Sequence, residues 1–202
     1  DKPHRHLGDI LALIDGASLT SRTVERAKRI FERLAQAEAS VHDIPIEQVH
    51  FHEVGADDSI ADIVGACVAL ELLDVDRIVC SAIPPGSGYI DCDHGKLPVP
   101  APATAALLRN VPTAPAAIQG EAITPTAAAI FTALAESFAP LPQMRIAAVG
   151  YGAGTRDEGP MPNLLRLFIG EPAEDDDADS VVELSVNLDD CTGEIIGRTM
   201  EK

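Results

Sequence analysis

Apolar residues recur every three or four positions along several stretches of this chain, the spacing that places them on one face of a helix. In residues 21–39 such a stripe alternates with a charged face, and Ser18 or Thr20 precedes it as a candidate N-cap. A second stripe begins at Ile60, after a polar stretch, and runs to a turn at residues 74–76. Shorter helices are predicted over residues 7–14, 102–109 and 125–138.

Strands are expected where short apolar runs lie between turn residues. They are predicted over residues 77–83, 89–92, 96–99, 113–118, 144–151, 163–169 and 181–186, with a hairpin around Asp93-His94-Gly95. The strand at 77–83 follows a helix, a β-α-β spacing typical of parallel neighbours joined by a right-handed crossover. The predicted fold class is α/β, with α+β as the alternative, in the form of a mixed sheet with flanking helices.

An acidic run at residues 171–179 marks a predicted domain boundary. Its side chains are too polar to form a core, so we expect a flexible linker. The linker would separate a first domain over residues 1–170 from the beginning of a second, truncated α/β domain over residues 180–202. Because the chain opens at Asp1 and continues as His4-Arg5-His6-Leu7, without an initiator methionine, we expect a fragment of a longer protein.

The chain carries 32 acidic and 15 basic residues, a formal net charge of −17 at pH 7. Such a charge repels nucleic acid and anionic lipid and attracts cations, so neither a nucleic-acid nor a membrane partner is expected. Without a visible signal peptide or membrane-spanning apolar run, a cytoplasmic protein is predicted. The four cysteines form no C-x-x-C pair, so free thiols are expected, with Cys67 in the core and Cys92 a candidate ligand near His94.

Two histidines and four carboxylates fall within residues 50–62, directly before an apolar helical stripe. In an extended run, His50 and His52 point to one face while Phe51 points to the other. Imidazole nitrogens suit nickel and zinc, and carboxylates suit magnesium or manganese, so these histidines and Glu53 are candidate metal ligands. Structural histidines would explain the same pattern.

The carboxylates at the start of the following helix also have two interpretations. Asp58 or Ser59 is the predicted N-cap, and Ser59 and Asp62 have the spacing of a capping box. Asp58 and Asp62 also lie four residues apart on one side of the first turn, where they could contribute to a cation site. Capping and metal binding remain open alternatives.

Three further segments carry candidate site residues. His94, at the predicted hairpin tip, is a candidate acid, base or ligand, or else a turn residue with an unusual backbone angle. Thr124 is a natural N-cap before Pro125, and the free amides of that helix start could hold a phosphate, although capping alone explains both residues. Residues 150–154 form a Gly-x-Gly-x-Gly run, but no helix follows and the required lysine is absent, so no nucleotide-binding loop is predicted.

Several long motifs stand in a recognisable order. The central one is His50-Phe51-His52-Glu53-Val54-Gly55-Ala56, followed by Asp58-Ser59-Ile60-Ala61-Asp62-Ile63-Val64-Gly65. Supporting motifs lie at residues 83–88, 94–104, 119–126, 150–154, 162–166 and 187–190. In these motifs, over nearly its whole length, the sequence resembles the LarC nickel-insertion family.

The resemblance implies an enzyme, a nickel chelatase or cyclometallase of the lyase class. It would insert nickel into pyridinium-3,5-bisthiocarboxylic acid mononucleotide and so make the nickel-pincer cofactor of lactate racemase. The implied cofactors are nickel, and magnesium or manganese with CTP. The implied partners are the mononucleotide, CTP and the apo-racemase, and a homo-oligomer is expected.

Under this interpretation, His50, His52 and Glu53 carry nickel, while Asp58 and Asp62 orient them or bind a harder ion.

The candidate catalytic residues are His94 and Glu53, with His94 as the base or an accessory ligand. Thr124 and Thr126 are the candidates for holding the phosphate. The family's glycine-rich N-terminal segment is missing from this sequence, and the region expected to bind CTP is cut off soon after Asp190.

Two other classes of protein would also use these histidines and carboxylates. A non-enzymatic nickel store or metallochaperone would bind nickel through the same histidines without consuming nucleotide. A zinc- or manganese-dependent hydrolase would require three or more of these side chains around one metal with an open position.

Overall fold

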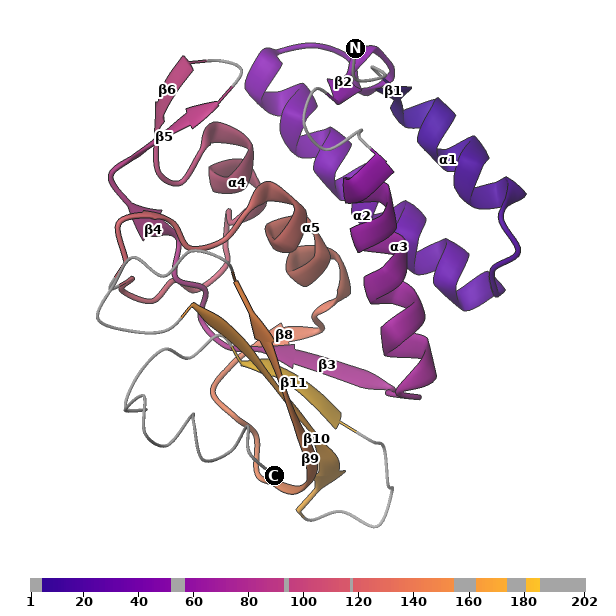
Figure 1. The fold of residues 1–202 in the computed structure, drawn as a ribbon, viewed down its shortest axis with the longest axis vertical. Helices are drawn as coiled ribbons and strands as arrows, with labels where there is room; N and C mark the ends of the chain where they lie inside the picture. The colour runs from indigo at the N-terminus through magenta and orange to yellow at the C-terminus, as the bar shows by residue number, and fades with distance from the viewer. Residues whose placement is uncertain are drawn as a thin grey trace.

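The computed structural model describes residues 5–51, 57–92, 95–116, 118–154, 163–173 and 181–185. A group of helices occupies the upper part of the molecule in Figure 1, and a five-stranded sheet lies below it. The helices are α1 (Leu7–Gly16), α2 (Ser21–His42), the 3-10 turn η1 (Ile46–Gln48), α3 (Asp57–Leu72), α4 (Pro102–Leu107) and α5 (Pro125–Leu134).

The strands vary from two to ten residues in length. They are β1 (Arg5–His6), β2 (His50–Phe51), β3 (Arg77–Cys80), β4 (Gly86–Ser87), β5 (Tyr89–Cys92), β6 (Gly95–Pro98), β7 (Gly120–Glu121), β8 (Ser137–Phe138), β9 (Met144–Ala153), β10 (Leu164–Pro172) and β11 (Val181–Ser185).

Helix α2 is the centre of the helical layer, because it contacts α1, α3, α4 and α5. Its predicted apolar stripe is confirmed: Ile30, Phe31 and Leu34 are fully buried. The predicted N-cap is also confirmed, since the Thr20 hydroxyl accepts a hydrogen bond from the backbone N–H of Thr23 at 3.2 Å. The position of the cap and the stripe explains why one amphipathic segment becomes the longest helix described.

The large sheet is mixed, as predicted, with the order β8-β3-β11-β10-β9. Strand β10 pairs antiparallel with both β9 and β11, whereas β3 pairs parallel with β11 and β8. The expected parallel pairing across α3 is wrong. Strand β2 pairs antiparallel with β1, and the partners of β3 come from segments much later in the chain.

The helix predicted over residues 125–138 and the strand predicted over residues 113–118 are among the elements that differ from the structure. Helix α5 ends at Leu134 instead of continuing to Phe138, because Ala135 is already extended and residues 137–138 form β8 against β3. The strand expected over residues 113–118 is reduced to one bridge between Thr113 and Ile83. In both places, pairing with the segment around β3 decides the conformation.

The motif at residues 83–88 folds into a tight loop that pairs β4 with β7. Gly86 has a φ of +96°, and a Cβ there would collide with the carbonyl oxygen of Gly120. Only glycine, which has no Cβ, adopts this φ without strain and avoids this collision. The predicted hairpin follows as β5 and β6, with β6 beginning one residue earlier than expected, and His94 lies outside the described residues.

Strand β11 lies between β3 and β10 in the sheet, although it follows the acidic run in sequence. The division of the chain into domains at residues 171–179 stays a prediction. Within the described residues, none of the helices has both the length and the apolar character needed to cross a membrane.

Candidate functional site

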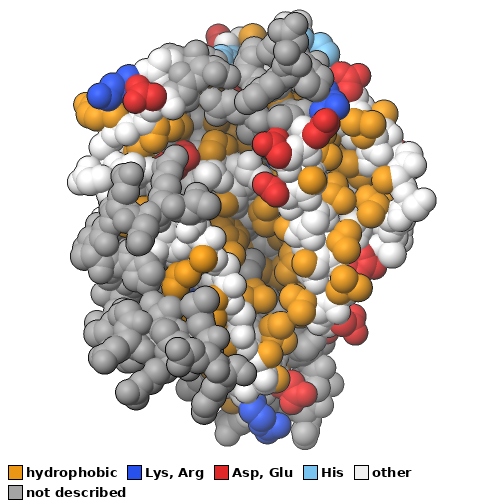
Figure 2. Space-filling model, in the orientation of Figure 1, with side chains coloured by type: hydrophobic (Ala, Val, Ile, Leu, Met, Phe, Trp, Pro, Cys, Tyr) orange, Lys and Arg blue, Asp and Glu red, His pale blue; other side chains and the backbone are white. Residues whose placement is uncertain are grey.

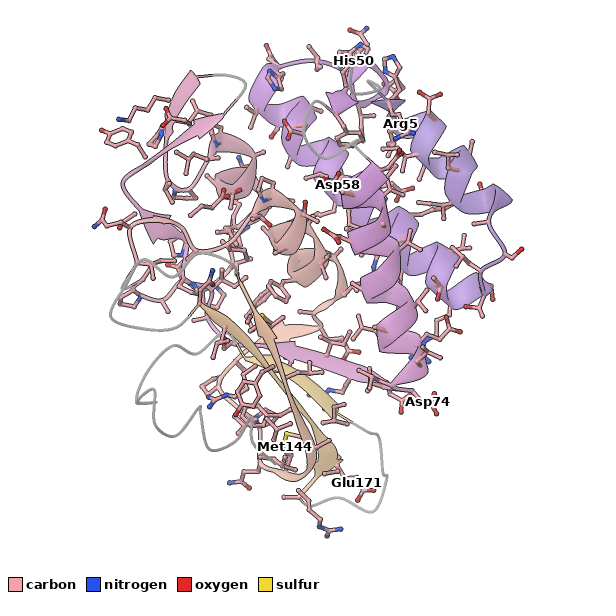
Figure 3. All side chains as sticks on the ribbon, viewed as in Figure 1. Arg5, His50, Asp58, Asp74, Met144 and Glu171 are labelled. Carbon is pink, nitrogen blue, oxygen red and sulfur yellow. The ribbon has the colours of Figure 1, made fainter. Side chains whose placement is uncertain are left out.

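His50 and Phe51, the first two residues of the polar stretch, lie at one end of the helical layer, where β2 pairs antiparallel with β1 (Figure 3). The register places Arg5 opposite Phe51 and His6 opposite His50. His50 is exposed and Phe51 is only 2% exposed, so the predicted alternation of these two side chains is confirmed. The exposed imidazole is therefore held by a strand that is anchored in the core.

The pairing of β1 with β2 brings a second histidine to His50. The ring centroids of His6 and His50 lie 3.9 Å apart, with the ring planes tilted by 47°. The Nδ1 atom of His6 is buried and has no hydrogen-bond partner. Leaving a buried polar atom unpaired costs on the order of 1–3 kcal/mol. This nitrogen is therefore a candidate to bind a ligand such as a metal ion.

His6 is the functional candidate that sequence reasoning missed. The run His4-Arg5-His6 was visible, but nothing local indicated that residue 6 would pair with residue 50. A search for histidines that flank two-residue strands would not have found the register either, because such strands carry almost no pattern.

Arg5 links this strand pair to the start of α3. Its guanidinium Nη1 lies 2.7 Å from Oδ1 of Asp57, whose side chain is 83% exposed. Such an exposed ion pair contributes only about 0–1 kcal/mol to stability. Its local effect is electrostatic, since the carboxylate offsets the positive charge beside the two imidazoles.

Helix α3 begins at Asp57, so Ser59 and Asp62 both lie inside the helix and the predicted capping box is wrong. Asp58 accepts a hydrogen bond from the backbone N–H of Ser59 at 2.8 Å, and the side chains of Asp58 and Asp62 are exposed. Figure 2 shows acidic side chains gathered near the start of this helix, at the upper end of a hollow lined with hydrophobic side chains.

The structure does not bring His50, Asp58 and Asp62 together as one group of ligands. Among the described residues, no three His, Cys, Asp or Glu side chains lie close enough to hold a metal ion. His52, Glu53 and His94 lie outside the described residues, so their assignment as site residues stays a prediction.

Thr124 is confirmed as the N-cap of α5, and Pro125 is the first residue of the helix. The Thr124 hydroxyl accepts a hydrogen bond from the backbone N–H of Ala127 at 3.3 Å. Thr124 is exposed and Thr126 is half-buried. The two residues thus lie at the positive end of a helix dipole, and phosphate binding there stays a prediction.

Cys67 lies in the core, as predicted, and is fully buried between α3 and its neighbours. Burial raises the pKa of its thiol to about 11, and the nearby guanidinium groups of Arg26 and Arg29 only partly oppose this shift. The thiol is therefore neutral at physiological pH and is a poor metal ligand.

A second polar feature lies between α2 and α4, where a cavity of about 190 Å³ is lined by Arg33, Gln36, Arg109 and Asn110 among others. Arg33 donates to the carbonyl oxygen of Leu107 at 3.5 Å, while its buried Nε has no partner. Guanidinium and amide donors in the lining of one cavity suit an oxyanion such as phosphate or carboxylate.

Together, the described residues define a mixed α/β protein that presents an imidazole pair beside an acidic helix start. Residues 1–202 match the family model described as nickel insertion protein, and the chain belongs to that family. This finding confirms the family that the motifs indicated.

The curated relatives agree with this assignment. A protein of Geotalea daltonii named "Putative nickel insertion protein" is 52% identical over 202 residues, covering 100% of this chain and 52% of the relative. A Staphylococcus epidermidis protein named "Pyridinium-3,5-bisthiocarboxylic acid mononucleotide nickel insertion protein" is 47% identical over 197 residues, covering 98% of this chain and 49% of the relative. The chain spans about half the length of these relatives, and no solved structure matches it significantly.

Proposed function

We propose that the protein containing this chain inserts nickel into pyridinium-3,5-bisthiocarboxylic acid mononucleotide. The observation that carries this proposal is the 47% identity, over nearly the whole chain, to a Staphylococcus epidermidis relative named for that reaction. Membership of the nickel insertion family supports the choice of metal. In this reaction nickel is a substrate of the protein and not a resident cofactor.

The proposed reaction is a cyclometallation. Two carbon-bound sulfur groups of the substrate bind nickel, one ring C–H bond breaks, a nickel–carbon bond forms, and the ring proton passes to a base. The proposal includes CTP consumption assisted by magnesium or manganese, a lyase classification, and a product that serves as the pincer cofactor of lactate racemase. It also includes a cytoplasmic location, a homo-oligomeric state and delivery to the apo-racemase.

The proposed nickel carriers are His50, His52 and Glu53. Imidazole binds nickel well, and an exposed strand residue such as His50 can take an ion from solvent and release it again. Asp58 and Asp62, both exposed on α3, are proposed to attract the incoming cation, orient the histidines or bind the harder magnesium or manganese ion.

The remaining roles concern the mononucleotide. His94 and Glu53 are proposed as the catalytic residues, with His94 as the base that takes the ring proton. Thr124 and Thr126 are proposed to bind the phosphate at the start of α5. The geometry that supports this last role is the exposed N-cap of a ten-residue helix, where partial positive charge accumulates.

The alternative function is nickel storage or delivery without chemistry. It would use the same histidines, and the exposed position of His50 is compatible with it. A metal-dependent hydrolase would need three or more of these side chains around one metal ion with an open position.

One assay separates these functions. The intact protein is incubated with Ni²⁺, the bisthiocarboxylic acid mononucleotide, CTP and Mg²⁺, and the products are followed by mass spectrometry. The proposed function requires a product that has gained nickel and lost one proton, together with CMP and the pyrophosphate that CTP releases when water cleaves it. Stoichiometric nickel binding with neither metallated product nor CMP would establish storage instead.

A further inference from the structure

The pairing of β1 with β2 gives His50 a histidine neighbour that the central motif does not contain. His6 and His50 stand opposite each other in the register, and their rings are in contact at a centroid distance of 3.9 Å. We propose that His6 and His50 bind the same nickel ion and form its docking site. The proposal deepens the proposed function and rests on it.

The geometry allows one ion to reach both rings. A first-row metal lies about 2.0–2.1 Å from an imidazole nitrogen, so two nitrogens that share one ion lie within roughly 4 Å of each other. Rings with centroids 3.9 Å apart need only side-chain rotation to reach that arrangement. The backbone of β1 and β2 can therefore remain paired when the ion binds.

His6 also has a nitrogen available for the ion. Its Nδ1 is buried and unpartnered, whereas its backbone N–H donates to Asp9 at 2.9 Å. When the ring proton resides on Nε2, the Nδ1 lone pair is free to bind a metal. The backbone N–H of this residue thus has a structural role at the start of α1.

The surroundings favour a cation that stays exchangeable. Asp57 pairs with Arg5 at 2.7 Å and offsets the nearest guanidinium charge, and the chain as a whole is strongly acidic. Two imidazoles leave several coordination positions of nickel open, and His50 is exposed to solvent. Sulfur groups of the substrate can therefore replace water on the ion before the histidines release it.

The test uses the intact protein and compares four single variants and one double variant with the wild type. His6→Gln and His50→Gln each remove one imidazole, and His6→Phe keeps a ring against His50 without a nitrogen. His42→Gln is the control, because it removes an exposed imidazole at the C-terminal end of α2 that pairs with Glu38 and not with His6 or His50. Nickel affinity is measured by isothermal titration, and thermal unfolding without nickel checks the fold.

The proposal predicts that His6→Gln, His6→Phe and His50→Gln each weaken nickel binding about tenfold or more, while His42→Gln changes it less than about twofold. The loss of nickel affinity in the double variant of His6 and His50 should be smaller than the sum of the two single losses, because both residues bind the same ion. X-ray absorption at the nickel edge should show one imidazole fewer in His6→Phe than in the wild type.

The proposal is overturned if His6→Phe binds nickel as the wild type does, or if the two losses are simply additive. In that case His50→Gln can still abolish nickel binding and insertion, and the proposed function stands without His6. If the wild-type protein binds nickel at the His6–His50 pair but makes no metallated product, the docking site stands and the insertion function fails.

Discussion

The ring of Phe51 meets the ring of Phe31 edge-on, with centroids 6.4 Å apart and planes inclined by 68°. Phe31 belongs to the buried stripe of α2, and Phe51 is the inward-facing residue of β2. Since His50 is the adjacent residue on that strand, the aromatic contact fixes the backbone from which the exposed imidazole projects. The core and the candidate metal site are thus joined through one peptide unit.

The first prediction concerns this anchor. Phe51→Ala should lower the free energy of unfolding by about 3–5 kcal/mol, because it leaves a cavity beside Phe31 and removes an aromatic contact. Nickel binding by the protein that remains folded should also weaken, since β2 loses its attachment to the core. Urea unfolding monitored by circular dichroism and nickel titration measure the two effects.

The control for this variant is Tyr151→Ala, which removes an aromatic ring that is 52% exposed on β9. It should change stability by less than about 0.5 kcal/mol and leave nickel affinity unaltered. An unchanged free energy of unfolding in Phe51→Ala would show that the contact contributes nothing measurable.

The second prediction concerns acid sensitivity at the other end of the helical layer. The carboxylate of Glu71 accepts hydrogen bonds from the hydroxyls of Thr20 and Thr23, and these bonds hold its pKa below the ordinary value of 4.5. A carboxyl group with a lowered folded-state pKa stabilises the fold above its unfolded-state pKa. That contribution is lost as the pH falls through the folded-state value.

Glu71→Gln should therefore destabilise the protein at neutral pH and should make its stability fall less steeply below about pH 4.5. Unfolding curves collected between about pH 3 and about pH 7 measure how steeply the free energy of unfolding changes with pH. Glu25→Gln removes the same charge from the exposed face of α2 and is the matched control. Parallel pH profiles for Glu71→Gln and the wild type would contradict the assigned cause.

The features that the sequence predicted correctly are those that depend on residues close together in the chain. The caps at Thr20 and Thr124 and the buried stripe of α2 follow from side chains within one or two helical turns. The early end of α5 could not be predicted, because Ala135 favours a helix and the pairing of β8 with β3 places the following residues in the sheet. Long-range pairing overrides local propensity there.

The candidate site shows the same limit. His50 stood out because it lies in a dense polar motif, whereas His6 becomes its neighbour only through the pairing of two strands of two residues each. For Ser59 and Asp62, a local pattern was misleading. Their spacing matches a capping box, but both residues lie inside a helix that begins at Asp57. A short motif does not determine where its helix starts.

The third prediction concerns the thiols. Cys67 and Cys80 are fully buried, and burial raises the pKa of the Cys67 thiol to about 11. Because the thiolate is the reactive form, both residues should resist alkylation in the native protein and react readily in denaturant. Iodoacetamide labelling with site-resolved mass spectrometry measures this, with the denatured protein as the control. Fast labelling of Cys67 under native conditions would mean that the contact of α3 with α2 opens easily.

The last prediction separates the two possible roles of Thr124. Thr124→Ala should destabilise the protein by about 0.5–2 kcal/mol, because the N-cap of α5 is lost. Thr124→Asp keeps a capping oxygen and places a negative charge at the favourable end of the helix dipole, so stability should be retained. If the substrate phosphate binds there, the same carboxylate should raise the KM for the mononucleotide by about tenfold or more.

Steady-state insertion kinetics and thermal unfolding of both variants supply the two readouts. A structural cap alone predicts that Thr124→Asp has the stability and the KM of the wild type. That result would mean that the substrate phosphate binds at another site. The cavity between α2 and α4 has side-chain donors that could bind it. Arg109→Gln should then raise the KM while Thr124→Asp does not, because the guanidinium would be the group that neutralises the phosphate charge.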